Sequence, residues 1–233
     1  MERRYQLVLF DMDGTFIDSR PFHARLFFEF FKKYWKPVDY ERCYRAVGTT
    51  VRELFDQCGL PKEHQEAYFD LLDDYYNNEC TDLIPMTRAS EGFSELLKWL
   101  RGQGVKTGVV TNSLDCVVRK ILKYHGLWDL FDNITGADRN SKDKKDRCRK
   151  ILNRYQISPE HVLYVGDTES DLLLANEMGF DACFAKTPIA WFQDEEYIRK
   201  ELKPAITVQS YFELRDVLEN TDPCVFSDVQ ISK

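Results

Sequence analysis

Two groups of acidic residues could do chemistry, and each comes directly after a short apolar run. The first is Asp11-Met12-Asp13-Gly14-Thr15, and the second is Gly166-Asp167-Thr168-Glu169-Ser170-Asp171. Neighbouring carboxylates repel one another, so a bound cation would relieve the repulsion and attract a phosphate. The two groups therefore indicate a cation-assisted reaction on an anion.

Each acidic group also has a simpler explanation. The first could be an acidic turn or a calcium loop, but Thr15, Phe16 and Phe22 stand where an EF-hand needs other residues. In the second, Asp167 or Thr168 could cap the helix that follows. Capping accounts for one group alone and not for both, which favours the functional interpretation.

The apolar runs predict the elements that position these residues. Each run is short and continuously apolar, as expected of a parallel strand that is covered on both faces. The runs lie at residues 5–11, 105–111, 161–166, 181–185 and 205–208. From residue 86 onward they alternate with helical stripes, such as Phe93, Leu96, Leu97 and Leu100. This alternation predicts an α/β fold with a doubly wound parallel sheet, whose ligands bind at the carboxyl ends of the strands.

Residues 17–85 break the alternation. They suggest consecutive helices with aromatic stripes and no good strand, and Thr50 with Glu53 offers a capping box for one helix. We therefore predict an α/β core formed by residues 1–16 and 86–221, an inserted all-helical cap at 17–85, and a loosely held tail at 222–233.

Composition excludes several classes of function. A formal charge of −7 argues against nucleic-acid binding, and no apolar stretch is long enough to span a membrane. The seven cysteines are scattered and contain no Cys-x-x-Cys pair. We therefore expect a reduced, cytoplasmic protein without a zinc site.

The spaced acidic groups resemble the first and fourth motifs of the haloacid dehalogenase superfamily. Between them, Val109-Val110-Thr111-Asn112-Ser113 is similar to the second motif, an apolar strand that ends in Ser or Thr. The inserted helices match the cap of one branch of this superfamily. The resemblance extends to about residue 210, and it is the combination of motifs that makes it specific.

The resemblance implies a role for each acidic residue. Asp11 would attack phosphorus to form an aspartyl-phosphate, while Asp13 would protonate the leaving oxygen and then activate water. Mg²⁺ would be held by Asp11, by the main-chain carbonyl of Asp13 and by Asp167. Asp171 would act through a metal-bound water or the catalytic lysine.

Further residues follow from the same resemblance. Thr111 and the Asn112 backbone would hold the phosphoryl oxygens. The third motif requires a lysine to neutralise charge, and Lys142, Lys144 and Lys145 are the candidates. Without gaps, Lys142 aligns with the Lys-Pro-x-Pro form of the motif and Lys144 with the proline-free form, and we favour Lys144. The others would be ordinary surface lysines.

Three residues of the predicted cap are candidates for substrate binding. In relatives, a histidine at the position of His23 faces the leaving group, although a histidine among aromatic residues is more often structural. Thr50 and Arg52 lie in a cap loop that faces the substrate in similar proteins. Arg52 could instead pair with Glu53 or Asp56.

The resemblance predicts an enzyme that hydrolyses a small phosphorylated metabolite, either a phosphoglycolate-like acid or a sugar phosphate, with Mg²⁺ as its cofactor. A phosphomutase of the β-phosphoglucomutase kind is the alternative. A catalytically silent binding protein is disfavoured because all four acids are present, and a dehalogenase would lack the acid at Asp13. The identity of the substrate and the oligomeric state stay open.

Overall fold

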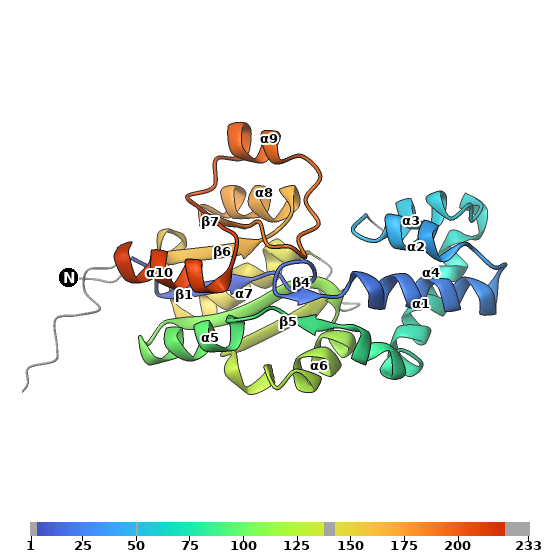
Figure 1. Cartoon of the computed structure of the whole chain (residues 1–233), viewed down its shortest axis with the longest axis horizontal. Coiled ribbons are helices and arrows are strands. Elements are labelled where there is room, and N and C mark those ends of the chain that lie inside the picture. Colours follow the sequence, from blue (N-terminus) through green and yellow to red (C-terminus); the bar gives the residue numbers. More distant parts are fainter. Residues whose placement is uncertain (1–3, 50, 138–142, 222–233) are drawn as a thin grey trace, which may run out of the picture.

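The computed structural model describes residues 4–49, 51–137 and 143–221 (Figure 1). Six parallel strands form one sheet in the order β5-β4-β1-β6-β7-β8. The strands are β1 (Leu7–Phe10), β4 (Lys106–Leu114), β5 (Asn133–Ala137), β6 (Val162–Gly166), β7 (Asp181–Ala185) and β8 (Ile206–Val208).

Helices cover both faces of this sheet (Figure 1). α5 (Phe93–Gly102), α6 (Asp115–Tyr124) and α10 (Tyr211–Thr221) pack on one side, and α7 (Lys144–Tyr155) and α8 (Glu169–Met178) on the other. Side chains of β1 alternate accordingly: Val8 and Phe10 join the first layer, and Leu7 and Leu9 join the second. The predicted doubly wound α/β fold is confirmed.

The strand order places the two acidic groups at one edge. β1 lies between β4 and β6, and Phe10 pairs with both Val109 and Val165. From β1 the chain first builds the sheet toward β5 and later toward β8, so the order changes direction here. Such a switch point, at the carboxyl ends of the strands, is where open α/β sheets bind ligands.

A helical insertion, residues 20–86, projects to one side of the sheet (Figure 1). It consists of α1 (Arg20–Tyr34), α2 (Tyr40–Ala46), α3 (Val51–Gln57), α4 (Lys62–Asn78) and the short helix η1 (Thr81–Met86). Its interior is aromatic, with Phe30 and Phe31 of α1 packed near Tyr75 and Phe55.

Two short strands that the sequence did not reveal join the insertion to the sheet. β2 (Ile17–Asp18) pairs antiparallel with β3 (Arg88–Ala89), so the entering and leaving segments lie side by side. The expectation of no strand in residues 17–85 therefore fails at its first two residues. A two-residue strand is too short to produce a period-2 pattern.

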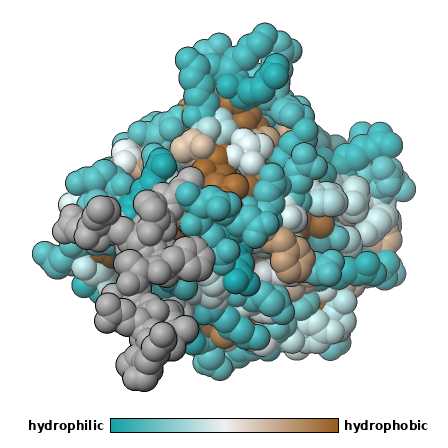
Figure 2. Space-filling model, turned by 60° about the vertical axis from the view of Figure 1, so that its left-hand side comes forward, coloured by the Kyte–Doolittle hydropathy of each residue, from teal (hydrophilic) through white to brown (hydrophobic). Residues whose placement is uncertain are grey.

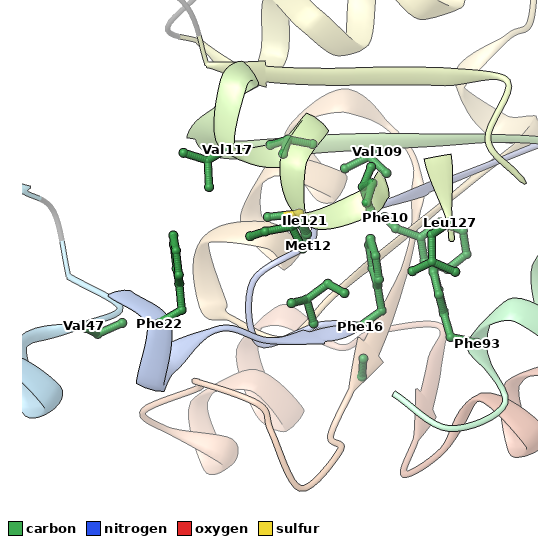
Figure 3. Packing of buried hydrophobic residues seen from close by; sticks show 14 of the residues in the cluster. Phe10, Met12, Phe16, Phe22, Val47, Phe93, Val109, Val117, Ile121 and Leu127 are labelled. Atoms are coloured by element: carbon green, nitrogen blue, oxygen red, sulfur yellow. The ribbon is translucent and has the colours of Figure 1, made fainter. Parts of the chain in front are cut away.

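One apolar cluster runs from the sheet into the insertion. Phe16 stacks on Phe93 at 4.1 Å between ring centroids, and Phe10 packs edge-on against Phe93 at 5.2 Å. Figure 3 shows Phe22 and Val47 at the insertion end of the same cluster. This continuous packing supports the loop that carries Asp11 and Asp13.

The remaining short helices are η2 (Trp128–Leu130), η3 (Pro159–His161), α9 (Glu195–Tyr197) and η4 (Ile198–Leu202). The face in Figure 2 is mostly hydrophilic, with apolar side chains in small areas. Within the described ranges, no helix combines the length and apolar character needed to cross a bilayer.

Candidate active site

The loop after β1 is a tight turn held by its own backbone. The N–H groups of Phe16 and Ile17 donate to the Met12 carbonyl at 3.1 and 3.0 Å, and Gly14 N–H donates to Ile17 at 2.9 Å. Gly14 has φ +76°, and a Cβ there would lie 2.5 Å from an Asp167 oxygen. Only glycine allows this turn to approach the second acidic group so closely.

Three buried carboxylates meet at the switch point. Ligand atoms of Asp11, Asp167 and Asp171 lie within 4.8 Å of one another. Asp167 accepts hydrogen bonds from Thr15 Oγ1 and from the Trp191 N–H, both at 2.6 Å. Burial, together with the charges of Asp171 and Asp11, raises the pKa of Asp167 well above its ordinary value. Clustered oxygen ligands of this kind fit a hard divalent cation such as Mg²⁺.

Lys144 neutralises part of this charge. Its Nζ lies 2.7 Å from Asp11 Oδ1 and 2.8 Å from Asp171 Oδ1. Burial alone would lower the pKa of Lys144, but the carboxylates of Asp11 and Asp171 raise it well above its ordinary value. Lys145 instead pairs with Glu177 at the surface, and Lys142 lies outside the described residues.

The environment of Asp11 disfavours its charged form. Burial raises the pKa of Asp11 to about 7, an effect that the positive charge of Lys144 opposes and the negative charges of Asp171 and Asp13 reinforce. A cation bound by this group of acids would compensate the negative charge, lower the pKa of Asp11 and displace its proton.

Asp13 lies in the opposite environment, surrounded by donors. Its Oδ1 accepts from Ser19 Oγ at 2.6 Å, and its Oδ2 accepts from Ser113 Oγ at 2.6 Å and Thr111 Oγ1 at 3.3 Å. Burial works against the charged form, yet the hydrogen bond and charge of His23 and the two serine hydroxyls hold the pKa of Asp13 below its ordinary value.

His23 connects Asp13 with the helical insertion. Its Nε2 lies 3.1 Å from Asp13 Oδ1, and its Nδ1 lies 3.0 Å from the Tyr76 hydroxyl of α4. When His23 is neutral and donates to Asp13 through Nε2, its Nδ1 accepts from the Tyr76 hydroxyl, and when His23 is protonated, both ring nitrogens donate. Burial and the nearby Asp13 charge raise the pKa of Tyr76 well above its ordinary value, which keeps the phenol protonated.

The second acidic group also caps a helix. Thr168 is the N-cap of α8, and its hydroxyl and N–H both donate to Asp171 Oδ2, at 2.6 and 3.2 Å. Asp171 thus uses one oxygen for the cap and the other for Lys144. Of the two capping residues considered from sequence, Thr168 caps the helix and Asp167 faces the acidic cluster.

A buried arginine of α7 binds two residues of the second motif. Arg147, one turn after Lys144 on α7, donates from Nη2 to the Thr111 carbonyl at 2.9 Å and to Asn112 Oδ1 at 3.2 Å. In β4, Thr111 is the last buried residue and Asn112, which follows it, is exposed. The side chain of Asn112 is therefore oriented by α7, the helix that also carries Lys144.

Of the two remaining candidates from the predicted cap, Arg52 lies apart from these contacts. Arg52 binds Glu66 at 2.6 Å and lies over the Phe69 ring, so its carboxylate partner is neither Glu53 nor Asp56. Thr50, and with it the proposed capping box to Glu53, lies outside the described residues.

Several contacting residues had no signal in the sequence that singled them out. Tyr76 belongs to an aromatic stripe, and packing of the helix is enough to account for such a stripe. Trp191 and Arg147 belong to no motif. Ser113 does stand inside the quoted second motif, and its hydroxyl, two residues after Thr111, could have been recognised as a candidate donor.

Comparison with known proteins defines the class. The chain belongs to the haloacid dehalogenase-like hydrolases, whose family model matches residues 8–185. It is 28% identical over 185 residues to phosphoglycolate phosphatase 1 of Pseudomonas aeruginosa, covering 75% of this chain and 66% of that protein. It is 26% identical over 226 residues to pyrophosphatase PpaX of Halalkalibacterium halodurans, covering 91% and 95%.

The fold is shared with solved structures. A haloacid dehalogenase-like hydrolase from Streptococcus pneumoniae superposes with a TM-score of 0.78 at 20% identity, over 93% of this chain and 99% of that chain. The resemblance inferred from the motifs, and the expectation of a hydrolase, are therefore confirmed.

Proposed function

We propose that this protein is a Mg²⁺-dependent phosphatase that hydrolyses a small phosphate ester through an aspartyl-phosphate on Asp11. The observation that carries the proposal is the contact of Lys144 with both Asp11 and Asp171 inside the three-carboxylate cluster. Relatives named as a phosphoglycolate phosphatase and a pyrophosphatase support the substrate class.

In the first step, Asp11 attacks phosphorus while Lys144 neutralises charge on the nucleophile and the phosphoryl oxygens. Asp11, Asp167, Asp171 and the Asp13 carbonyl would hold Mg²⁺, which supplies further charge neutralisation when bound. Thr111 and Asn112, held by Arg147, would orient the phosphoryl group.

Asp13 would act on protons in both steps. The donors around it favour the carboxylate, the form that takes a proton from the attacking water. For the first transfer, Asp13 must instead carry a proton and exchange some of these donors for the leaving oxygen. His23 would help to hold Asp13 in place and would face the leaving group.

We further propose that residues 17–85 form a cap that closes over a core of residues 1–16 and 86–221. Hinges would lie near residues 16–20 and 81–86, beside the β2–β3 pair. Closure would exclude water during the first transfer and admit one molecule for the second. Because the six described cysteines are free thiols, we place the enzyme in a reducing compartment such as the cytoplasm.

The test is phosphate release from a panel of phosphorylated metabolites with Mg²⁺, comparing wild type with Asp11→Asn. Asp146→Asn, which changes a surface carboxylate paired with Arg149, is the matched control. We expect release by wild type and the control and none by Asp11→Asn. If all three are equally inert, the phosphatase proposal is wrong, and transfer between the positions of a sugar phosphate would then indicate the mutase.

A further inference from the structure

Arg20 lies between the sheet and the helical insertion without a carboxylate partner. It is the first residue of α1 and is half-buried. Its guanidinium carbon lies 5.1 Å from the ring centroid of Trp191 and 5.8 Å from that of Tyr44. Among the residues that the structure describes, no carboxylate lies within ion-pair distance of it.

Other arginines that contact aromatic rings mostly bind a carboxylate as well, and the exception, Arg154, is exposed over the neighbouring Tyr155. Arg25 lies over Phe28 and also binds Glu29, and Arg52 lies over Phe69 and also binds Glu66. In those pairs the stacked guanidinium is already neutralised. Arg20 has the same aromatic support, which restricts its motion, but its N–H groups have no such anion to bind.

Trp191 connects Arg20 to the catalytic residues. Its main-chain N–H donates to Asp167, and its ring centroid lies 6.2 Å from that of His23, edge-on. A Cβ on Gly14 would lie 2.8 Å from the indole, and one on Gly48 would lie 3.4 Å from it. The indole therefore fills the space between the Asp13 loop and the insertion, with Arg20 over its ring.

The start of α1 adds positive potential at the same place. Ser19 is the N-cap residue, but its side chain makes no capping bond and donates to Asp13 instead. The first-turn N–H groups of a 15-residue helix are thus left without a side-chain cap beside Arg20.

We infer that Arg20, supported by Trp191, is a specificity-determining residue that binds a second anionic group on the leaving group of the substrate. The inference rests on the proposed phosphatase function. The leaving oxygen must lie at Asp13, and His23, Trp191 and Arg20 follow one another from there toward the insertion. A carboxylate or a second phosphate meets the fork geometry of a guanidinium, whereas a neutral sugar does not.

The first experiment compares kcat/KM for three compounds: 2-phosphoglycolate, pyrophosphate and the neutral-tailed ethyl phosphate. Arg20→Gln should lower kcat/KM for whichever compound with a second anionic group is the substrate by about 10- to 100-fold, the range for hydrogen bonds to charged groups. Ethyl phosphate should change by less than about threefold. Arg20→Lys, which keeps the charge without the fork, should fall between, and Arg25→Gln should match wild type.

A binding measurement separates this inference from the proposed function. The Asp11→Asn variant cannot form the phosphoenzyme. Its affinity in the presence of Mg²⁺, measured by calorimetry, should be higher for the two compounds with a second anionic group than for ethyl phosphate, and adding Arg20→Gln should remove that preference. An equal loss of affinity for all three compounds, or no loss, would overturn the role of Arg20 even if phosphatase activity is found. A preference that depends on Arg20 would support it even if turnover is absent. Loss confined to 2-phosphoglycolate or to pyrophosphate identifies a carboxylate or a phosphate as the anion.

Discussion

Two halves of the site, which share one five-residue loop, have opposite electrostatics. We name the halves after their proposed roles: the metal half gathers negative charge, and the proton half gathers hydrogen-bond donors. The first consists of Asp11, Asp167, Asp171 and Lys144, and the second of Asp13, Ser19, Ser113, His23 and Tyr76. Burial is the largest influence on both loop carboxylates, yet the pKa of Asp11 is raised to about 7 while that of Asp13 is lowered. The neighbouring groups, and not the position in the sequence, give the two carboxylates pKa shifts of opposite sign.

Removing the carboxylate of the proton half should have the largest effect. Asp13→Asn should lower turnover of an alkyl phosphate by about 10²- to 10⁴-fold, because neither the leaving oxygen nor the attacking water has a proton partner. An aryl phosphate has a good leaving group, so its first transfer should persist. Rapid-quench measurement should then show one equivalent of aryl alcohol released before turnover stalls. Alkyl turnover within tenfold of wild type would contradict the assigned role.

The metal half should respond next to loss of its lysine. Lys144→Met removes the cation that contacts Asp11 and Asp171, and should lower kcat by about 10²- to 10³-fold, as loss of a charge-stabilising donor does. Lys145→Met is the matched control, because that side chain pairs with Glu177 at the surface. Steady-state assays of both variants decide between the two lysines. A larger loss in the control would transfer the role to Lys145.

Sequence reasoning predicted that the acidic side chains of the metal half would meet, because the ends of the strands fix their positions. Asp11 and Asp167 directly follow β1 and β6, which pair with each other, so two apolar runs and the parallel sheet suffice to bring them together. Lys144 was harder to predict, since three lysines stand within four residues and only the start of α7 selects one.

Strand β5 was missed because its residues, Asn133–Ala137, include few apolar side chains.

The proton half was only partly predictable. Tyr76 reaches His23 from a helix 53 residues later, and its hydroxyl is not marked by any motif. Trp191 comes from the loop after β7, whose course depends on packing against Gly14 and Gly48. These contacts depend on how the insertion sits on the sheet, which periodicity along a single segment cannot reveal.

The stabilisation of the metal half by Mg²⁺ should depend on pH. In the metal-free protein the raised pKa of Asp11 means that its stabilising contribution is full below the unfolded-state pKa of about 4 and is lost as pH rises through about 7. The pKa of Asp167 is raised in the same direction, so its contribution is also lost with rising pH. Mg²⁺ should offset this loss. The increase in Tm on adding Mg²⁺ should therefore be larger at pH 8 than at pH 5, and smaller in Asp11→Asn. Equal increases at both pH values would argue against metal binding at these carboxylates.

The smallest expected effect tests how the insertion supports the proton half. Tyr76→Phe removes the hydroxyl that contacts His23 Nδ1, so the imidazole is no longer held with its Nε2–H toward Asp13. One hydrogen bond of about 1 kcal/mol corresponds to roughly a fivefold loss of turnover. Because Asp13 also loses part of the interaction that lowers its pKa, the acid limb of the pH–rate profile should move to higher pH.

The control is Tyr75→Phe. Tyr75 is a neighbouring buried tyrosine that packs against Phe30 and Tyr34, so this variant should leave the profile unchanged. If both variants lose activity without moving the acid limb, Tyr76 contributes only packing, and Asp13 is tuned by the serines alone.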